Sequence, residues 1–310
     1  MRNYGLDLLR GLAAFFIVGC HLQLLDYTPW GSRLLHFCDM NVGVFAALAG
    51  FLMAGSVAEV GNGRDWLRYV VKRARRLLPA YFAWTVVFLL ATAAFQFVMG
   101  GAVKPKYSSF QFWTSVVFWG NASTHLWFVA SLFYAQCLLG GVLHRVPRVV
   151  WLVASMALMA VASRWQSWYA AYPIRLLSFL LLGYCFRGWR VECSMPVLGF
   201  ALTAALLVHV FAPIPGFCRD WIAASPIILF FANFRDGLRD SWASFLGGTS
   251  MGVYLIHPLM TVGMAVFVKR LCVAPYGIAP TLAVWIGAWL LSLGLTVVLQ
   301  RIRSLQWLVR

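Results

Sequence analysis

Residues 281–299 read TLAVWIGAWLLSLGLTVVL, nineteen positions without a charged side chain. A helix needs about 20 apolar residues to cross the hydrocarbon core of a bilayer, so this stretch is long enough to span a membrane. Similar runs recur along the chain and predict ten helical spans, at 8–25, 41–58, 80–99, 125–143, 149–163, 174–186, 196–212, 221–234, 244–268 and 281–299. The stretch 108–120, rich in Phe and Trp, is too short to span and is expected to lie at the membrane interface.

The composition agrees with this interpretation. Of the 310 residues, 62% are hydrophobic and only 11% are charged, whereas a soluble domain carries about 25% charged residues. A soluble enzyme and a disordered chain are therefore excluded. The predicted fold class is an all-α polytopic membrane protein, in which a single membrane domain covers residues 1–310 and no extracytoplasmic domain is appended.

The net charge of +16 is explained by topology rather than by nucleic-acid binding. The basic residues sit in small groups between apolar runs, and no continuous basic domain exists to follow phosphates. With ten spans, sixteen Lys and Arg residues fall on the side of the two termini and eight on the other. Because cytoplasmic loops carry the excess of positive charge, both termini are predicted to be cytoplasmic.

The seven cysteines show neither a CxxC pair nor a Cys/His pair at zinc spacing, so no metal site is expected. Three of them, Cys38, Cys218 and Cys272, fall near predicted outer ends of spans. A disulfide among these three is left open, and the sequence does not select a pair.

The first predicted span contains two ionisable residues, Arg10 and His21. Eleven helical positions amount to three turns plus about 20°, which places both on one helix face about 16 Å apart. Ionisable residues inside a span are costly and indicate function by default. The competing interpretations are a snorkelling anchor for Arg10 and an interhelical hydrogen bond for His21. Asp7, three positions before Arg10, is expected to pair with it on the helix surface.

A dense basic segment follows the second span, in what the sequence predicts to be a cytoplasmic loop. Its cations are Lys72, Arg73, Arg75 and Arg76. Such a cluster is most often only a topological signal. The functional alternative is a phosphate site, because the guanidinium fork binds two phosphate oxygens at once.

Several segments together resemble the acyltransferase 3 family of integral-membrane acyltransferases. The start Leu6-Asp7-Leu8-Leu9-Arg10 to His21 is similar to the family's Arg, ten residues, His pattern, and Arg73-Ala74-Arg75-Arg76 matches its cytoplasmic RxxR. Further similar segments follow in family order: Asn41-Val42-Gly43-Val44-Phe45 through Ala49-Gly50-Phe51-Leu52, His125-Leu126-Trp127-Phe128, and Ser250 with Tyr254-Leu255-Ile256-His257-Pro258. Ala49 and Met251 depart from the family's usual Ser and Tyr. The Glu that some members place after H-x-W is also missing, since no acidic residue occurs between Asp65 and Glu192.

The resemblance implies a bacterial inner-membrane enzyme that moves an acyl group to a hydroxyl. Acetyl from acetyl-CoA is the expected donor group, a cell-envelope polysaccharide or lipid-linked glycan the expected acceptor, and no permanently bound cofactor is expected. His21, helped by Arg10, would be a general base or an acyl carrier, and Lys72, Arg73, Arg75 and Arg76 would hold the CoA phosphates. Asp39 is the first choice for a partner of His21. Supporting or acceptor-side roles are expected for Asn41, His125, Trp127, Tyr254 and His257. The alternative function is a transporter or flippase of a glycan or small metabolite, although no paired broken helices are recognisable.

Overall fold

The computed structural model describes residues 3–22, 29–98, 110–120, 123, 125–164, 168–187, 194–211, 216–234, 242–271 and 277–309. Within these ranges the chain forms α-helices and short 3-10 turns, and no strand. The helices are α1 (Tyr4–Gly19), α2 (Pro29–Val57), α3 (Gly63–Val98), α4 (Phe110–Trp119), α5 (Leu126–Gly140), α6 (Arg148–Arg164), α7 (Trp168–Phe186), α8 (Met195–Phe211), α9 (Gly216–Asn233), α10 (Trp242–Leu271) and α11 (Ile278–Arg301).

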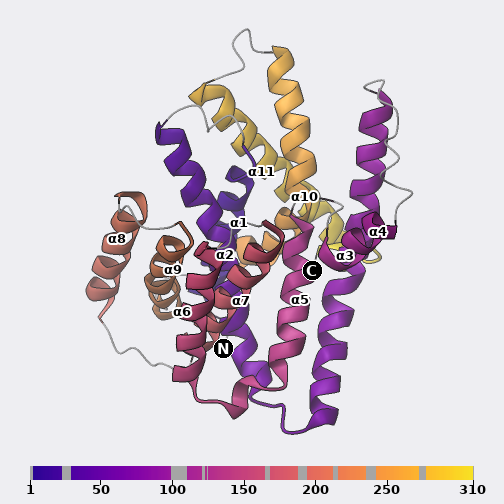
Figure 1. Ribbon diagram of the computed structural model, residues 1–310. Coiled ribbons are helices and arrows are strands. Elements are labelled where there is room, and N and C mark those ends of the chain that lie inside the picture. Colours follow the sequence, from indigo (N-terminus) through magenta and orange to yellow (C-terminus); the bar gives the residue numbers. More distant parts are fainter. Residues whose placement is uncertain are drawn as a thin grey trace.

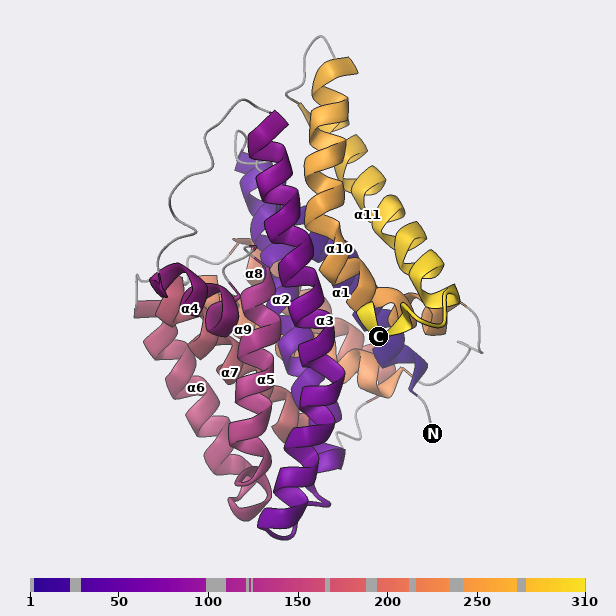
Figure 2. The same ribbon diagram turned by 90° about the vertical axis from the view of Figure 1, so that its right-hand side faces the viewer.

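The helices pack around a central group made of α1, α2 and α7 (Figure 1). The strongest packing joins α2 to α7, α10 to α11, α1 to α10, and α6 to α7. Helices α8 and α9 lie on one flank of the centre, and α3 and α5 lie on the other. Seen from the side, α10 and α11 form a pair that leans away from α3 (Figure 2).

Each of the ten predicted spans overlaps one helix, and the short aromatic stretch forms α4. Four helices in the described ranges are long and apolar enough to cross a membrane: residues Gly31–Val57, Gly63–Phe97, Trp242–Leu271 and Ile278–Arg301. The expectation of an all-helical, multi-pass membrane chain is therefore met. The ten-span count and the side of each terminus remain predictions.

Two helices begin well before the apolar run from which they were predicted. Helix α2 starts at Pro29 instead of residue 41, and α3 starts at Gly63 instead of residue 80. The Asn62 side chain accepts hydrogen bonds from the N–H groups of Arg64 and Asp65, at 2.9 and 3.0 Å, and so caps the start of α3. The prediction of a basic loop is wrong, because this segment is the first half of a helix that continues through Pro79.

The first helix also ends earlier than predicted, at Gly19. The N–H groups of Cys20 and Leu22 bond to carbonyls three residues back, which tightens the chain out of the α-helix. His21 therefore lies just beyond the helix. The prediction that Arg10 and His21 share one continuous helix face is wrong at its outer end.

Backbone contact holds α2 against α7 at the centre of the molecule. A Cβ on Gly50 would collide with the carbonyl of Leu180, and a Cβ on Gly183 would collide with the carbonyl of Ala47. Small residues at helix contacts allow this close approach in membranes. The two glycines thus set the distance between the helices that carry the polar groups described below.

Candidate active site

Three histidine rings from distant parts of the chain form one cluster. His21 follows α1, His125 precedes α5, and His257 lies in α10. The ring centroids of His21 and His257 are 5.0 Å apart, and those of His125 and His257 are 5.5 Å apart. His125 and His257 are buried, whereas His21 stays partly exposed. The structure thus brings together three residues that the sequence analysis had selected separately.

Tyr254 ties this histidine cluster together through its hydroxyl and its carbonyl. The hydroxyl donates to the carbonyl oxygen of His125 at 2.5 Å, and the carbonyl of Tyr254 lies 2.6 Å from Nδ1 of His257. On the other side, the hydroxyl oxygen of Ser123 lies 2.9 Å from Nδ1 of His125. The Nε2 atoms of His125 and His257 are buried and have no hydrogen-bond partner among the described residues.

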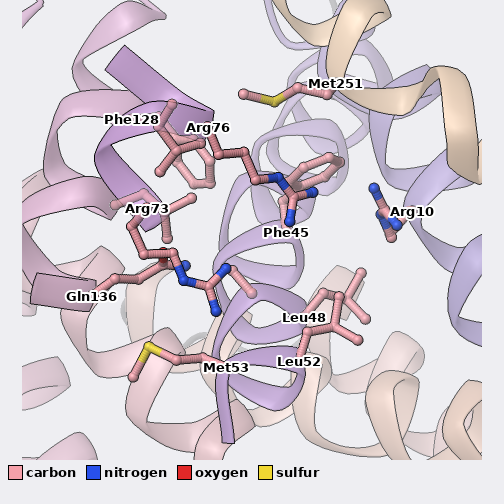
Figure 3. A pocket seen from close by; sticks show the side chains of 13 residues that line it. Arg10, Phe45, Leu48, Leu52, Met53, Arg73, Arg76, Phe128, Gln136 and Met251 are labelled. Carbon is pink, nitrogen blue, oxygen red and sulfur yellow. The ribbon is translucent and has the colours of Figure 1, made fainter. Parts of the chain in front are cut away.

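A second polar site is a cavity of about 110 Å³. Its cationic walls are Arg10 from α1 and Arg73 and Arg76 from α3, whose guanidinium groups point toward a common space (Figure 3). The remaining wall is largely apolar and includes Leu48, Leu52, Met53 and Met251, with Gln136 as a neutral polar group. Three cations around a mainly apolar space favour a ligand that has both an anionic part and an apolar part.

Only half of the basic segment reaches this arginine pocket. Arg73 and Arg76 line it, and Arg73 also lies over the ring of Tyr69, with 4.9 Å between Cζ and the centroid. Lys72 and Arg75 are exposed and do not contribute to the described lining. Arg10 pairs with Asp7 at 3.4 Å, which confirms the predicted contact on the helix surface.

Aromatic rings connect the arginine pocket to the histidine cluster. Phe45 and Phe128 line the pocket. Both also pack against Tyr254, with centroid distances of 6.0 and 5.4 Å. Tyr254 in turn lies 5.6 Å from the ring of His125 and 5.8 Å from that of His257. No histidine is among the described residues that line the pocket, so these rings form the wall between the two sites.

Asp39, the predicted partner of His21, is hydrogen-bonded elsewhere. Its carboxylate accepts a hydrogen bond of 2.8 Å from Arg175, and the other terminal nitrogen of Arg175 donates to Asp220 at 2.6 Å. His209 lies 3.4 Å from the second oxygen of Asp220. This pairing could not be predicted from the sequence, because Arg175 and Asp220 lie 136 and 181 positions from Asp39 and no spacing rule joins them.

The remaining predicted residues have structural contacts. The amide of Asn41 donates to the carbonyl of Phe37 at 2.8 Å, a bond within its own helix. Trp127 packs edge-on against Tyr172, with 5.2 Å between the centroids. Cys38 and Cys218 are free thiols, so these two do not form the disulfide that was left open, and Cys272 lies outside the described residues. In the described ranges, no three His, Cys, Asp or Glu side chains group in a way that could hold a metal ion.

Comparison with known proteins places this chain in a family. The sequence model of the acyltransferase 3 family, described as an acyltransferase domain, matches residues 3–301, and the chain therefore belongs to that family. The serine/alanine racemase of Enterococcus gallinarum is 27% identical over 304 residues, which cover 85% of this chain and 41% of that protein. The chain thus spans less than half the length of this relative. No solved structure matches the chain significantly.

Proposed function

We propose that this protein is a membrane O-acyltransferase of the bacterial inner membrane. It transfers an acyl group, acetyl from acetyl-CoA, to a hydroxyl of a cell-envelope polysaccharide or lipid-linked glycan. Family membership supports acyl transfer in general. The observation that carries the finer proposal is the arginine pocket, which shares an aromatic wall with a cluster of three histidines.

The donor binds in the arginine pocket. The nucleotide end of an acyl-CoA carries several phosphates, and Arg recognises phosphate with two parallel hydrogen bonds. Arg10, Arg73 and Arg76 surround the space where those phosphates would lie. The apolar wall formed by Leu48 and Leu52 suits the uncharged arm that carries the thioester.

The chemistry takes place at the histidine cluster. A hydroxyl is a poor nucleophile near neutral pH, and an imidazole can remove its proton as it attacks the thioester carbon. His21 is the partly exposed ring of the cluster, so it is the histidine that a substrate meets first. It acts there either as the base or as a transient carrier of the acyl group.

The two sites suit substrates that arrive from opposite sides of a membrane. In the ten-span topology the basic first half of α3 is cytoplasmic, and the turn that carries His21 faces outward. An acyl-CoA held inside and a glycan held outside would then meet at the aromatic wall. Neither substrate has to cross the membrane completely.

Donor kinetics in membranes test this proposal. We expect the pair Arg73→Gln and Arg76→Gln to raise the KM for acetyl-CoA about 100-fold or more, because two charge-assisted hydrogen bonds are lost and each is worth about 1.5–3 kcal/mol. The acceptor KM should change little. The matched control is the pair Arg64→Gln and Arg68→Gln, which removes the same charge from the same helix outside the pocket. His21→Ala should abolish transfer with normal membrane insertion.

Two results would contradict the proposal. An unchanged donor KM in the Arg73 and Arg76 double variant would mean that these arginines only set the membrane orientation and do not bind the donor. Uptake of a glycan or metabolite by vesicles, without any ester formed, would favour the transporter alternative.

A further inference from the structure

The segment Tyr254-Leu255-Ile256-His257-Pro258 of α10 holds an unusual helical hydrogen bond. In an α-helix the N–H of residue 258 would bond to the carbonyl of residue 254, but proline has no N–H to donate. The carbonyl of Tyr254 therefore loses its regular partner. Nδ1 of His257 occupies this place instead, 2.6 Å from the Tyr254 oxygen.

This contact fixes the protonation pattern of the His257 ring. A carbonyl oxygen can only accept a hydrogen bond, so Nδ1 of His257 must carry the hydrogen. In the neutral ring Nε2 is then a bare lone pair. Pro258 thus determines, through the backbone, which nitrogen of His257 is able to take up a proton.

The bare nitrogen belongs to a fully buried ring of the histidine cluster. His257 is 0% exposed, and its Nε2 meets no hydrogen-bond donor among the described residues. The rings whose centroids lie closest to that of His257 are those of His21 and His125, at 5.0 and 5.5 Å. A buried acceptor left unsatisfied is costly, and buried polar groups in proteins are nearly always hydrogen-bonded. A ligand that offers an O–H group would satisfy it.

We propose that Nε2 of His257 binds the acceptor hydroxyl and takes its proton. This inference rests on the proposed acyltransferase function and assigns the base within it. As the hydroxyl oxygen forms a bond to the acyl carbon, its proton moves to Nε2 of His257. The C–S bond then breaks, and the leaving thiolate receives that proton, which returns His257 to its starting state.

The assignment also explains how the site works without an acidic partner for its base. In many enzymes a carboxylate orients the catalytic imidazole and selects its tautomer. Among the described residues no carboxylate hydrogen-bonds to His257, and the carbonyl of Tyr254 selects the tautomer instead. His21, released from the role of base, is left to hold the acyl donor in place for the attack.

Two substitutions at position 257 separate the proton-accepting role from a packing role. His257→Asn places an amide nitrogen where Nδ1 lies and keeps the bond to Tyr254, but it removes Nε2. We expect kcat to fall by about 100-fold or more, with the acetyl-CoA KM unchanged. His257→Gln places an amide group where Nε2 lies. It should keep the acceptor KM closer to that of the wild type, with an equally low kcat.

The tautomer can be tested without turnover. Nitrogen NMR of histidine-labelled protein, assigned with His257→Asn, should show His257 neutral with its hydrogen on Nδ1. Pro258→Ala restores a backbone N–H that competes for the Tyr254 carbonyl, so the tautomers should mix and kcat should fall several-fold. The control is Pro226→Ala in α9, another proline inside a helix but without a histidine beside it.

The outcomes distinguish failure of the base assignment to His257 from failure of the proposed acyltransferase function. Transfer by His257→Asn at a rate near that of the wild type, or a hydrogen found on Nε2, overturns the role of His257 and leaves the proposed function standing. If wild-type membranes form no ester at all, the proposed function fails, and the base assignment fails with it.

Discussion

Arg175 is the buried charge on which the packing of α2, α7 and α9 depends. Its side chain is 3% exposed and its partner Asp220 is 6% exposed, whereas Asp39 is 35% exposed. Removing one partner of a buried ion pair costs about 3–5 kcal/mol, because the other charge stays desolvated. We therefore expect Arg175→Met to lower the free energy of unfolding by that amount, mainly through the stranded carboxylate of Asp220.

The companion variants should rank in a defined order. Asp39→Asn should cost about 1 kcal/mol or less, because this carboxylate is partly solvated and Arg175 keeps Asp220. The double variant Arg175→Met with Asp220→Leu removes both buried charges and should be more stable than Arg175→Met alone. Reversible unfolding in mixed micelles measures all three, and the single variant Asp220→Leu completes the double-mutant cycle that gives the coupling. A loss below about 1 kcal/mol in Arg175→Met, or additive effects in the double variant, would refute this reasoning.

Two further predictions concern packing. Gly183→Val should separate α7 from α2, because the new side chain meets the carbonyl of Ala47. Thermal unfolding should show a large loss of stability in this variant. The control Gly248→Val, at a glycine with open space around it, should lose little stability. Tyr81→Phe should loosen the attachment of α4, because the Tyr81 hydroxyl donates to the carbonyls of Val116 and Val117 at 2.7 and 3.0 Å. Amide hydrogen exchange in α4 should become faster, by the equivalent of about 1 kcal/mol in opening free energy. Exchange in α4 that is unchanged relative to the rest of the chain would contradict this.

The sequence identified the helices, but it misplaced several of their ends. Hydropathy detects the part of a helix that suits lipid, and α2 and α3 extend beyond that part into polar segments. Helical periodicity could have corrected α3, because the buried residues Tyr69, Leu77 and Ala80 lie on the same face as Arg73. The same periodicity would have separated Arg73 and Arg76, which line the pocket, from Lys72 and Arg75, which lie outside its described lining.

The candidate site was predictable to the extent that its contacts are local. His257 and Pro258 follow Tyr254 by three and four positions in the same helix. Helix geometry therefore places both of them next to the carbonyl of Tyr254. The convergence of His21, His125 and His257 depends on how three distant helices pack. The pairing of Asp39 with Arg175 depends on the same tertiary arrangement, and no short-range pattern reports it.

The wall made by Phe45, Phe128 and Tyr254 also affects whether ions and protons can leak through the protein across the bilayer. Any enzyme that opens toward both faces of an energised membrane risks becoming a leak for ions and protons. Tightly packed aromatic rings exclude water, and a dry constriction does not conduct. If donor and acceptor bind as proposed, this wall preserves the potential across the membrane while they meet.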